Sequence, residues 1–361
     1  MLVIMWHAFL TVTPSDPTQG QQRFSLPLGV SARETLVLFV LLSGYLLGRH
    51  WPGGFAREAM WPKFKLYVLR RTWRIVPAFW AAVTLTILAM LFLGLRHPEG
   101  THWDEGLPLT WLRAMANYLM ITDFWNQVPL SHPHWTVPME FHLYLLAPLI
   151  VLVRKQWLAM GLAVLVSLLA VFVLKDYHAP YFPFAFVAAF WAGVKRQSDT
   201  GVTLSSSLKV TWPAPVLSIG LMLVIATLGS GVLEPSTRNY FVADTLVGAV
   251  ALPWMYWTDV ADRRTPLVRF LRLRAFRWLG DRSYSIYLVH AVVLELLWRN
   301  IVRPLDIVGA TPNITVLTPI ALVASVLVGV VFFALIERPT ARKSARAGRV
   351  ATEPAVGTPL T

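Results

Sequence analysis

The sequence predicts an all-α membrane protein, a polytopic helical bundle of about ten transmembrane helices. Its 361 residues are 56% hydrophobic and only 14% charged, whereas soluble domains carry about 25% charged residues. Apolar runs approaching the roughly 20 residues needed to cross a bilayer recur along the chain. Sixteen tryptophans and ten tyrosines suit two wide membrane–water interfaces. Together these observations indicate a protein embedded in a membrane.

Ten apolar segments are the predicted spans. In chain order they are 1–12, 33–48, 77–95, 137–153, 157–174, 181–194, 213–232, 241–257, 283–301 and 316–336. The first is too short to cross a membrane, so we expect it to be truncated and Met1 to lie downstream of the true start. The segments 33–48 and 181–194 need flanking apolar residues to reach the required length.

The distribution of basic residues predicts the orientation. With a cytoplasmic N-terminus, three quarters of the 32 lysines and arginines fall on inner segments, and the bias alternates from loop to loop. Both termini are therefore expected in the cytoplasm. The net charge of +13 then reflects topology, and nucleic acid is not an expected partner.

The remaining segments complete the domain plan. The outer connection 96–136 contains a predicted re-entrant or interfacial helix at 111–120, and 265–279 reads as a basic helix on the inner leaflet. Residues 1–338 are expected to form one membrane domain and 339–361 a disordered cytoplasmic tail. With no cysteines, disulfides, thiolate metal sites and cysteine acyl-enzymes are excluded.

Two ionisable residues inside apolar spans are the first candidates for catalysis. His7 and Glu140 are costly to bury in a membrane, which marks such residues as functional candidates. Counted along their helices they lie within about one turn of the same depth, so Glu140 could orient His7 as a general base. The alternatives are a hydrogen-bonded core histidine and a carboxylate that pairs with backbone or an arginine.

A cluster of arginines is the candidate phosphate site. Arg71 and Arg74 are three residues apart, share a helix face and follow Arg70 at the inner mouth of the third span. Two guanidinium groups on one face can bind phosphate bidentately. The competing interpretation is purely topogenic, because basic residues belong at the inner end of any span.

Three further positions could line the site. Ser43 and Gly44 lie in the second span, where Gly44 and Gly48 also form a small-xxx-small pair typical of helix packing. His290 lies near mid-membrane in the ninth span, as a second site histidine or an interhelical hydrogen-bonding group. His132 and His134 match no zinc spacing, so no metal is expected.

Six stretches taken together resemble the membrane acyltransferase family 3, which contains bacterial inner-membrane O-acyltransferases. They occur in family order: His7, the run 38–47, the run 69–80, the residues Trp135, Glu140, Tyr144 and Pro148, the run 280–290, and the run 336–339. Two departures exist. The family's basic residue before the first-span histidine would precede Met1, and its serine two residues before the glutamate is Pro138.

The resemblance implies ten spans in a bacterial cytoplasmic membrane and an enzyme that transfers acyl groups other than aminoacyl groups. It implies that His7 is catalytic and that Arg71 and Arg74 contact acyl-CoA, while Ser43, Gly44, Glu140 and His290 fall at other motif positions. Tyr144 belongs to the same matching stretch as Glu140.

The expected reaction moves an acyl group, by expectation acetyl, from acyl-CoA as co-substrate to a hydroxyl of a carbohydrate, a glycosylated acceptor or a macrolide. No tightly bound cofactor is expected. Whether His7 acts as a base or as a transient acyl carrier stays open. The alternative function is a transporter or exporter of a glycolipid or small solute, which would predict repeat symmetry and broken helices in matching halves.

Overall fold

A computed structural model describes residues 2–12, 19–51, 60–122, 129–153, 155–173, 182–198, a few positions between 216 and 222, 237–260, 266–305 and 316–343. Within these ranges all regular structure is helical, as the sequence predicts. Contacts divide the chain into two units. The first unit comprises Met1–Trp6, Pro17–Phe55 and Leu146–Trp278, and the second comprises His7–Asp16, Ala56–Leu145 and Leu279–Thr361.

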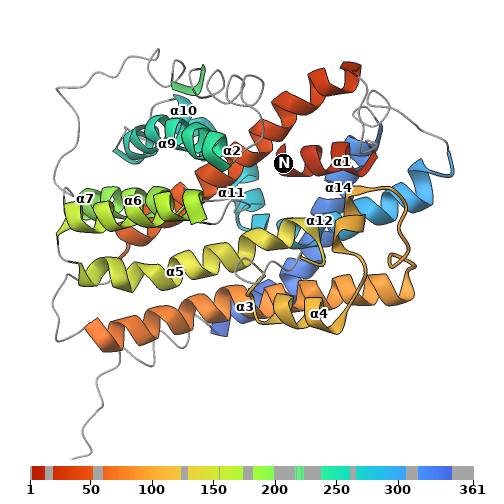
Figure 1. Ribbon diagram of the computed structural model, residues 1–361, viewed down its shortest axis with the longest axis horizontal. Helices are drawn as coiled ribbons and strands as arrows, with labels where there is room; N and C mark the ends of the chain where they lie inside the picture. The colour runs from red at the N-terminus through yellow and green to blue at the C-terminus, as the bar shows by residue number, and fades with distance from the viewer. Residues whose placement is uncertain are drawn as a thin grey trace, which may run out of the picture. The chain divides into compact units, whose positions relative to one another are not determined.

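The first unit contains α2 (Gln19–Arg49), α6 (Gln156–Val173), α7 (Phe182–Ser198), α9 (Thr237–Val260) and α10 (Pro266–Leu271). Helix α7 is its centre, because it packs against α2, α6 and α9 (Figure 1). The most extensive of these contacts joins α2 to α7.

Glycines bring α2 and α7 together. A Cβ atom added to Gly44 would lie 2.5 Å from the carbonyl oxygen of Phe186, and one added to Gly48 would lie 1.9 Å from that of Phe190. The approach is mutual, since a Cβ on Gly193 would lie 2.1 Å from the Tyr45 carbonyl oxygen. Backbones this close leave no room for side chains, and the packing interpretation of this stripe is confirmed.

One carboxylate ties three helices of the first unit together. Asp259 on α9 accepts a hydrogen bond from the Tyr45 hydroxyl of α2 at 2.9 Å. The same oxygen lies 3.2 Å from Nε of Arg49 and 3.3 Å from Nε of Arg196 on α7. The half-exposed ion pairs at this end of the unit thus add a polar contact to the glycine-mediated packing.

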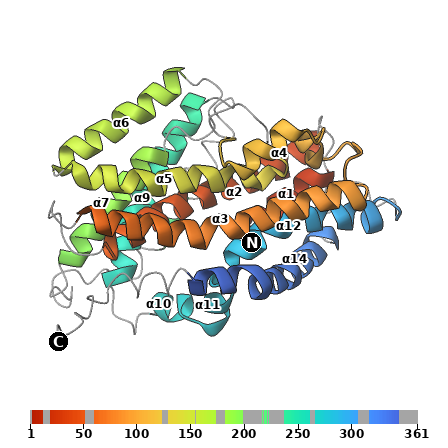
Figure 2. The same ribbon diagram turned by 90° about the horizontal axis from the view of Figure 1, so that it is seen from below.

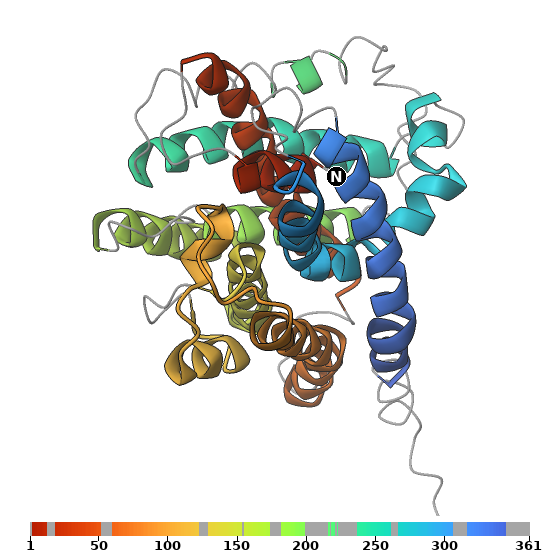
Figure 3. The same cartoon turned by 90° about the vertical axis from the view of Figure 1, so that its right-hand side faces the viewer.

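The second unit is built on α3 (Met60–Phe92), α12 (Ser283–Leu297) and α14 (Thr318–Phe332). Helix α12 contacts both α14 and α3 (Figure 2). Two helices continue into π-helical turns, α12 into Trp298–Val302 and α14 into Phe333–Glu337. Figure 3 shows α14 and its turn as one continuous blue helix. Shorter elements of this unit are α4 (Trp111–Tyr118) and the 3₁₀ turns η2 (His102–Gly106) and η3 (His132–Trp135).

The boundary between the units falls inside three helices. These are α1 (Leu2–Val12), α5 (Thr136–Leu152) and α11 (Arg274–Gly280). The part of α1 that belongs to the second unit is held by its core, because Ala8 is fully buried in an apolar cluster with Leu294, Val302, Leu317 and Ala321. This packing sets His7, one residue earlier, beside α12.

Helix α14 presents an apolar surface that suits lipid. Val323, Leu327, Val331 and Leu335 recur every four residues, so they share one helix face, and each is more than half exposed. Only 22% of the most apolar window of the helix is buried. A face of this kind is stable in hydrocarbon but not in water, which agrees with a membrane protein.

Over the part of the chain that it describes, the structure has helices at most of the predicted span positions, but fewer of these helices than predicted are long and apolar enough to cross a membrane. Among the described residues, three helices are long and apolar enough to cross a membrane: Phe64–Phe92, Ser283–Val302 and Thr318–Lys343. The count of ten is therefore not confirmed. Helices nevertheless occupy nine of the predicted segments, while 213–232 lies mostly outside the described residues.

Three smaller predictions meet mixed outcomes. The helix expected at 111–120 is α4. The single basic helix expected over 265–279 is instead two short helices, α10 and α11. The last helix continues to Lys343, past the expected start of the tail at 339, and the rest of that tail lies outside the described residues.

Candidate functional site

Two histidines 283 positions apart in the sequence meet in the second unit. Nδ1 of His7 on α1 lies 2.7 Å from Nε2 of His290 on α12. The two rings are parallel within 2°, with centroids 5.0 Å apart. His290 is fully buried. A short contact between two imidazole nitrogens requires one to donate and the other to accept.

The partners of His290 decide which nitrogen donates. Its Nδ1 lies 2.6 Å from the backbone carbonyl oxygen of Tyr287, and a carbonyl can only accept, so Nδ1 of His290 carries a proton. In the neutral ring Nε2 of His290 is then the acceptor, and Nδ1–H of His7 is the donor. The proton on Nδ1 leaves Nε2 of a neutral His7 as its basic nitrogen.

A second pair of histidines, His132 and His102, lies close to His7. The ring of His132 meets the His7 ring edge-on, with centroids 5.2 Å apart. His132 also lies against His102, and both bond to Glu105. Burial raises the pKa of Glu105, but hydrogen bonds from His102 and His132 outweigh it and lower this pKa to about 2. Glu105 is therefore an ionised carboxylate near neutral pH.

Turn η3 and the start of α5 are fastened to α12 by polar contacts directly after His132. The Tyr287 hydroxyl donates to the carbonyl of Pro133 at 2.8 Å and lies 2.8 Å from the Thr136 hydroxyl. Nε2 of the fully buried His134 donates to the Leu288 carbonyl at 3.1 Å. Burial lowers the pKa of His134 to about 4, against the opposing effect of this bond. His134 is thus a neutral structural group.

Turn η2 is held by an ion pair at the end of α12. Arg299 donates to the buried carboxylate of Glu295 at 2.7 Å, and its other nitrogens donate to the carbonyl oxygens of Gly94 and His97. Glu295 also accepts from the Thr101 hydroxyl at 3.0 Å, next to the start of η2. A charge-assisted network of this kind fixes the loop before His102.

Glu140 belongs to a second polar group, built from α3 and α5. Its carboxylate is buried and accepts a hydrogen bond from the Tyr144 hydroxyl at 2.6 Å. The guanidinium of Arg71 lies over the Tyr144 ring, 4.4 Å from its centroid, in the range of a cation–π contact. The Tyr67 hydroxyl donates to the Tyr144 carbonyl at 3.1 Å. Tyr144 therefore links the predicted phosphate site to the predicted catalytic carboxylate.

The other arginines of the cluster lie on the same helix. Arg74 is exposed, whereas Arg70 and Arg71 are half-buried. Arg74 lies close enough to Glu337 to interact with it electrostatically. The hydroxyl of Ser285 bonds to Glu337 at 2.5 Å, which connects α12 to the π turn after α14. Arg74 is thus the member of the cluster most open to a ligand.

The structure brings together only some of the predicted site residues. His7 is hydrogen-bonded to His290, and Glu140 is hydrogen-bonded to Tyr144. The expected orientation of His7 by Glu140 stays a prediction. His290, proposed from sequence as a second candidate, contacts His7 directly. Ser43 and Gly44 belong to the first unit, and their role in lining the site stays a prediction.

Sequence reasoning missed His102, Glu105 and the Arg299 network. A histidine and a glutamate three residues apart, as in His102–Glu105, can share one face of a helical turn. The spacing of His102 and Glu105 was the available signal, but His132, the second histidine bonded to Glu105, is 27 positions away from it. No local pattern connects the two.

Comparisons with known proteins give one clear match. A family of proteins described as having an acyltransferase domain matches residues 1–336, nearly the whole described chain. No curated protein and no solved structure matches the chain.

Proposed function

The chain belongs to acyltransferase family 3, and from that premise we propose that it is a membrane O-acyltransferase using acyl-CoA. The acyl group, by our proposal acetyl, passes to a hydroxyl of a carbohydrate, a glycosylated acceptor or a macrolide. The observation that carries this proposal is the His7–His290 pair. The family assignment favours it over the exporter considered from sequence.

His7 is the proposed general base. The Tyr287 carbonyl fixes the proton of His290 on Nδ1, so Nε2 of His290 accepts a hydrogen bond from the Nδ1–H of His7. His7 then offers a basic Nε2 with its ring held in one orientation. This is the arrangement of a base with an orienting partner, in which His290 takes the place that a carboxylate occupies in many hydrolases.

The proposed reaction is a direct transfer. Nε2 of His7 takes the proton of the acceptor hydroxyl while the hydroxyl oxygen attacks the thioester carbonyl carbon. A new C–O bond forms, the C–S bond breaks, and the departing CoA sulfur takes the proton back from His7. In the alternative route, Nε2 of His7 carries the acyl group transiently before the hydroxyl attacks.

Arg70, Arg71 and Arg74 are the proposed donor site. The exposed Arg74 offers a guanidinium to the CoA phosphates, as arginine does in bidentate phosphate recognition. Arg71 stacks on Tyr144, whose hydroxyl is bonded to Glu140. We assign Glu140 and Tyr144 the role of positioning Arg71. With both termini in the cytoplasm of a bacterium, these arginines face the compartment that supplies acyl-CoA.

The test is acyl transfer by the purified full-length chain in detergent, with acetyl-CoA and a panel of hydroxyl acceptors. Because the chain has no cysteine, a thiol-reactive dye measures released CoA without a protein background. His7→Ala should lower turnover by about 10²–10⁴-fold, the usual contribution of a positioned base.

His97→Ala is the matched control, because this exposed histidine lies in the outer loop and uses only its backbone carbonyl in the Arg299 network. It should keep wild-type turnover. Turnover of His7→Ala within twofold of the control, at equal protein level, would refute the proposal.

A further inference from the structure

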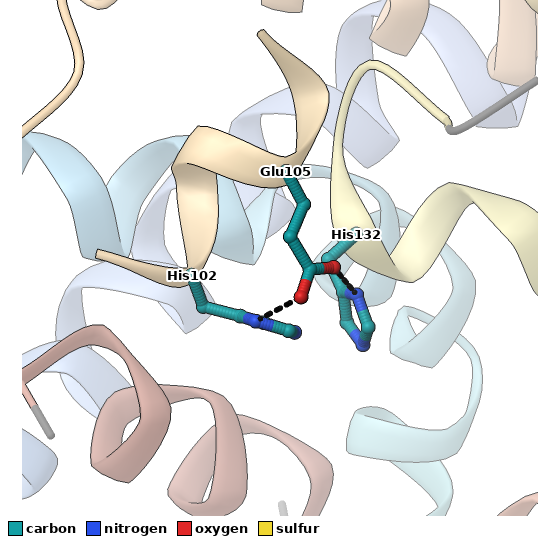
Figure 4. Close-up of side chains that lie close together, drawn as sticks. All are labelled: His102, Glu105 and His132. Carbon is teal, nitrogen blue, oxygen red and sulfur yellow. Dashed lines mark hydrogen bonds and ion pairs between the residues drawn. The ribbon is translucent and has the colours of Figure 1, made fainter. Parts of the chain in front are cut away.

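Three metal-binding side chains converge beside His7 on two turns of the second unit. Nδ1 of His102 lies 2.9 Å from one carboxylate oxygen of Glu105, and Nδ1 of His132 lies 3.3 Å from the other (Figure 4). In Figure 4 the carboxylate of Glu105 points between the two rings. Potential ligand atoms of all three residues lie within 4.8 Å of one another.

We propose that His102, Glu105 and His132 form a site for a divalent transition-metal ion, with zinc the best match. Two imidazoles and one carboxylate are a ligand set of zinc sites that keep a fourth position open. Zinc bonds of about 2.0–2.2 Å place tetrahedral ligand atoms about 3.4 Å apart. The observed nitrogen–oxygen distances are close to this value, so binding needs only small side-chain movements.

The second observation is an unsatisfied nitrogen. While Nδ1 of His102 bonds to Glu105, its Nε2 is buried and has no hydrogen-bond partner in the part of the chain that the structure describes. A buried nitrogen without a partner carries a desolvation cost. The His102 ring offers an ion two positions: Nδ1, at the spacing described above, or Nε2, which would gain the partner that it lacks. The unsatisfied nitrogen thus points to a ligand from outside the chain.

The turn that carries two of the three ligands is rigid before any ion binds. The carboxylate of Asp104 accepts from the backbone N–H groups of Glu99 and Gly100. Gly100 has φ +78°, a conformation that favours glycine. Gly106 meets the Leu130 carbonyl so closely that a Cβ would lie 2.3 Å away. That contact brings η2 against the segment leading to His132.

The ion would act next to the His7–His290 pair. Coordination of His132 would fix its ring against the edge of His7, at the observed 5.2 Å between centroids. The site stands independently of the proposed acyl transfer, because its residues bind an ion whether or not the protein transfers acyl groups. Metal binding and turnover are therefore measured separately.

The experiment uses the full-length chain purified with a tag that contains no histidine, stripped with chelator and then dialysed against zinc. Metal content is measured by mass spectrometry, and Co²⁺ titration follows the visible absorption of tetrahedral cobalt. The variants are His102→Ala, His132→Ala and the nearly isosteric Glu105→Gln, with His97→Ala as the matched control. Size-exclusion profiles verify that each variant is folded.

Wild type and His97→Ala should hold one zinc ion per chain. Each of the three site variants should bind at least about 10-fold more weakly, since even changes around a ligand cost about 10–100-fold in metal affinity. Glu105→Gln keeps the size of the side chain. A loss of zinc affinity in this variant therefore reports the loss of the carboxylate and not misfolding.

Two outcomes would overturn the proposal. One is equal zinc content in all five proteins, which would place the ion elsewhere. The other is no stoichiometric zinc or cobalt in wild type. If Glu105→Gln then still lowers turnover, the group is a hydrogen-bonded relay toward His7 and not a metal site.

Discussion

The two units of this protein use different means to pack their helices. In the first unit α2 and α7 meet through glycines, with backbone atoms in direct contact at Gly48 and Gly193. In the second unit buried polar groups join the elements: His7 to His290, Ser285 to Glu337, and Thr101 and Arg299 to Glu295. The first arrangement gives stability without chemistry. The second arrangement holds titratable groups in a buried site that excludes water, and in that site they can take part in a reaction.

The difference predicts that substitutions in the two units fail in different ways. Changes in the glycine interface should lower stability and leave the turnover of each folded molecule unchanged. Changes in the polar contacts around His7 should lower turnover at little cost in stability.

His290→Leu should lower turnover about 10³-fold, because the leucine side chain has no acceptor to fix the tautomer of His7, and a misplaced tautomer in a catalytic pair costs up to about 10⁴-fold. The measurement is CoA release at saturating acetyl-CoA, with the thermal midpoint recorded on the same sample. Turnover within tenfold of wild type would show that His290 does not orient His7.

Gly48→Ala should destabilise the protein by about 1–3 kcal/mol, the usual cost of overpacking, because its Cβ would lie 1.9 Å from the Phe190 carbonyl oxygen. The matched control is Gly161→Ala on α6, where a Cβ meets nothing within 4 Å. That change should stabilise by up to about 1 kcal/mol through helix propensity. Midpoints that shift in the same direction would contradict the close-packing argument.

Arg71→Ala combined with Arg74→Ala should raise the apparent KM for acyl-CoA about 10- to 100-fold, since hydrogen bonds to charged groups contribute about 1.5–3 kcal/mol. The turnover number should change less. Arg342→Ala, an exposed cation on the last helix, serves as the control for general loss of charge. An unchanged KM would assign the arginines to topology alone.

Tyr45→Phe should have the smallest effect, a loss of about 1 kcal/mol or less. The change removes one donor from Asp259 while Arg49 and Arg196 remain as partners. The expected result is a slightly lower thermal midpoint with normal turnover. A large loss of turnover would mean that this end of the first unit takes part in the reaction.

Much of the fold follows from local properties of the sequence. Apolar run length placed helices at nine segments, because burial of a helix in a membrane depends mainly on composition. The glycine stripe at Gly44 and Gly48 predicted close packing for the same local reason. Composition does not reveal helix ends, so the extension of α3 back to Met60 and the break between α10 and α11 were missed.

The candidate site was predicted less completely, since its contacts join residues far apart in the chain. His7 was found because an ionisable group in an apolar run is conspicuous. Its contact with His290 spans 283 positions and depends on how α1 packs against α12. Counting residues along each helix instead predicted Glu140 as the partner of His7. Such a count gives the depth of a residue in the membrane but not the direction in which its side chain points around the helix axis. Glu105 was missed because its partner His132 comes from another turn.

The Arg299 network has a consequence for how freely the loop between α3 and η2 can change in sequence. Arg299 donates hydrogen bonds to the backbone carbonyl oxygens of Gly94 and His97 and not to their side chains. Every amino acid supplies a backbone carbonyl, so anchoring at position 97 survives any side chain that keeps the same backbone path. Position 299 has no such latitude, because it must supply a planar group with several donors. Side chains at the loop positions can therefore vary at little cost, whereas a change at position 299 would break the contact. New side chains, and with them new specificities, can be introduced in the loop while it stays attached to Arg299.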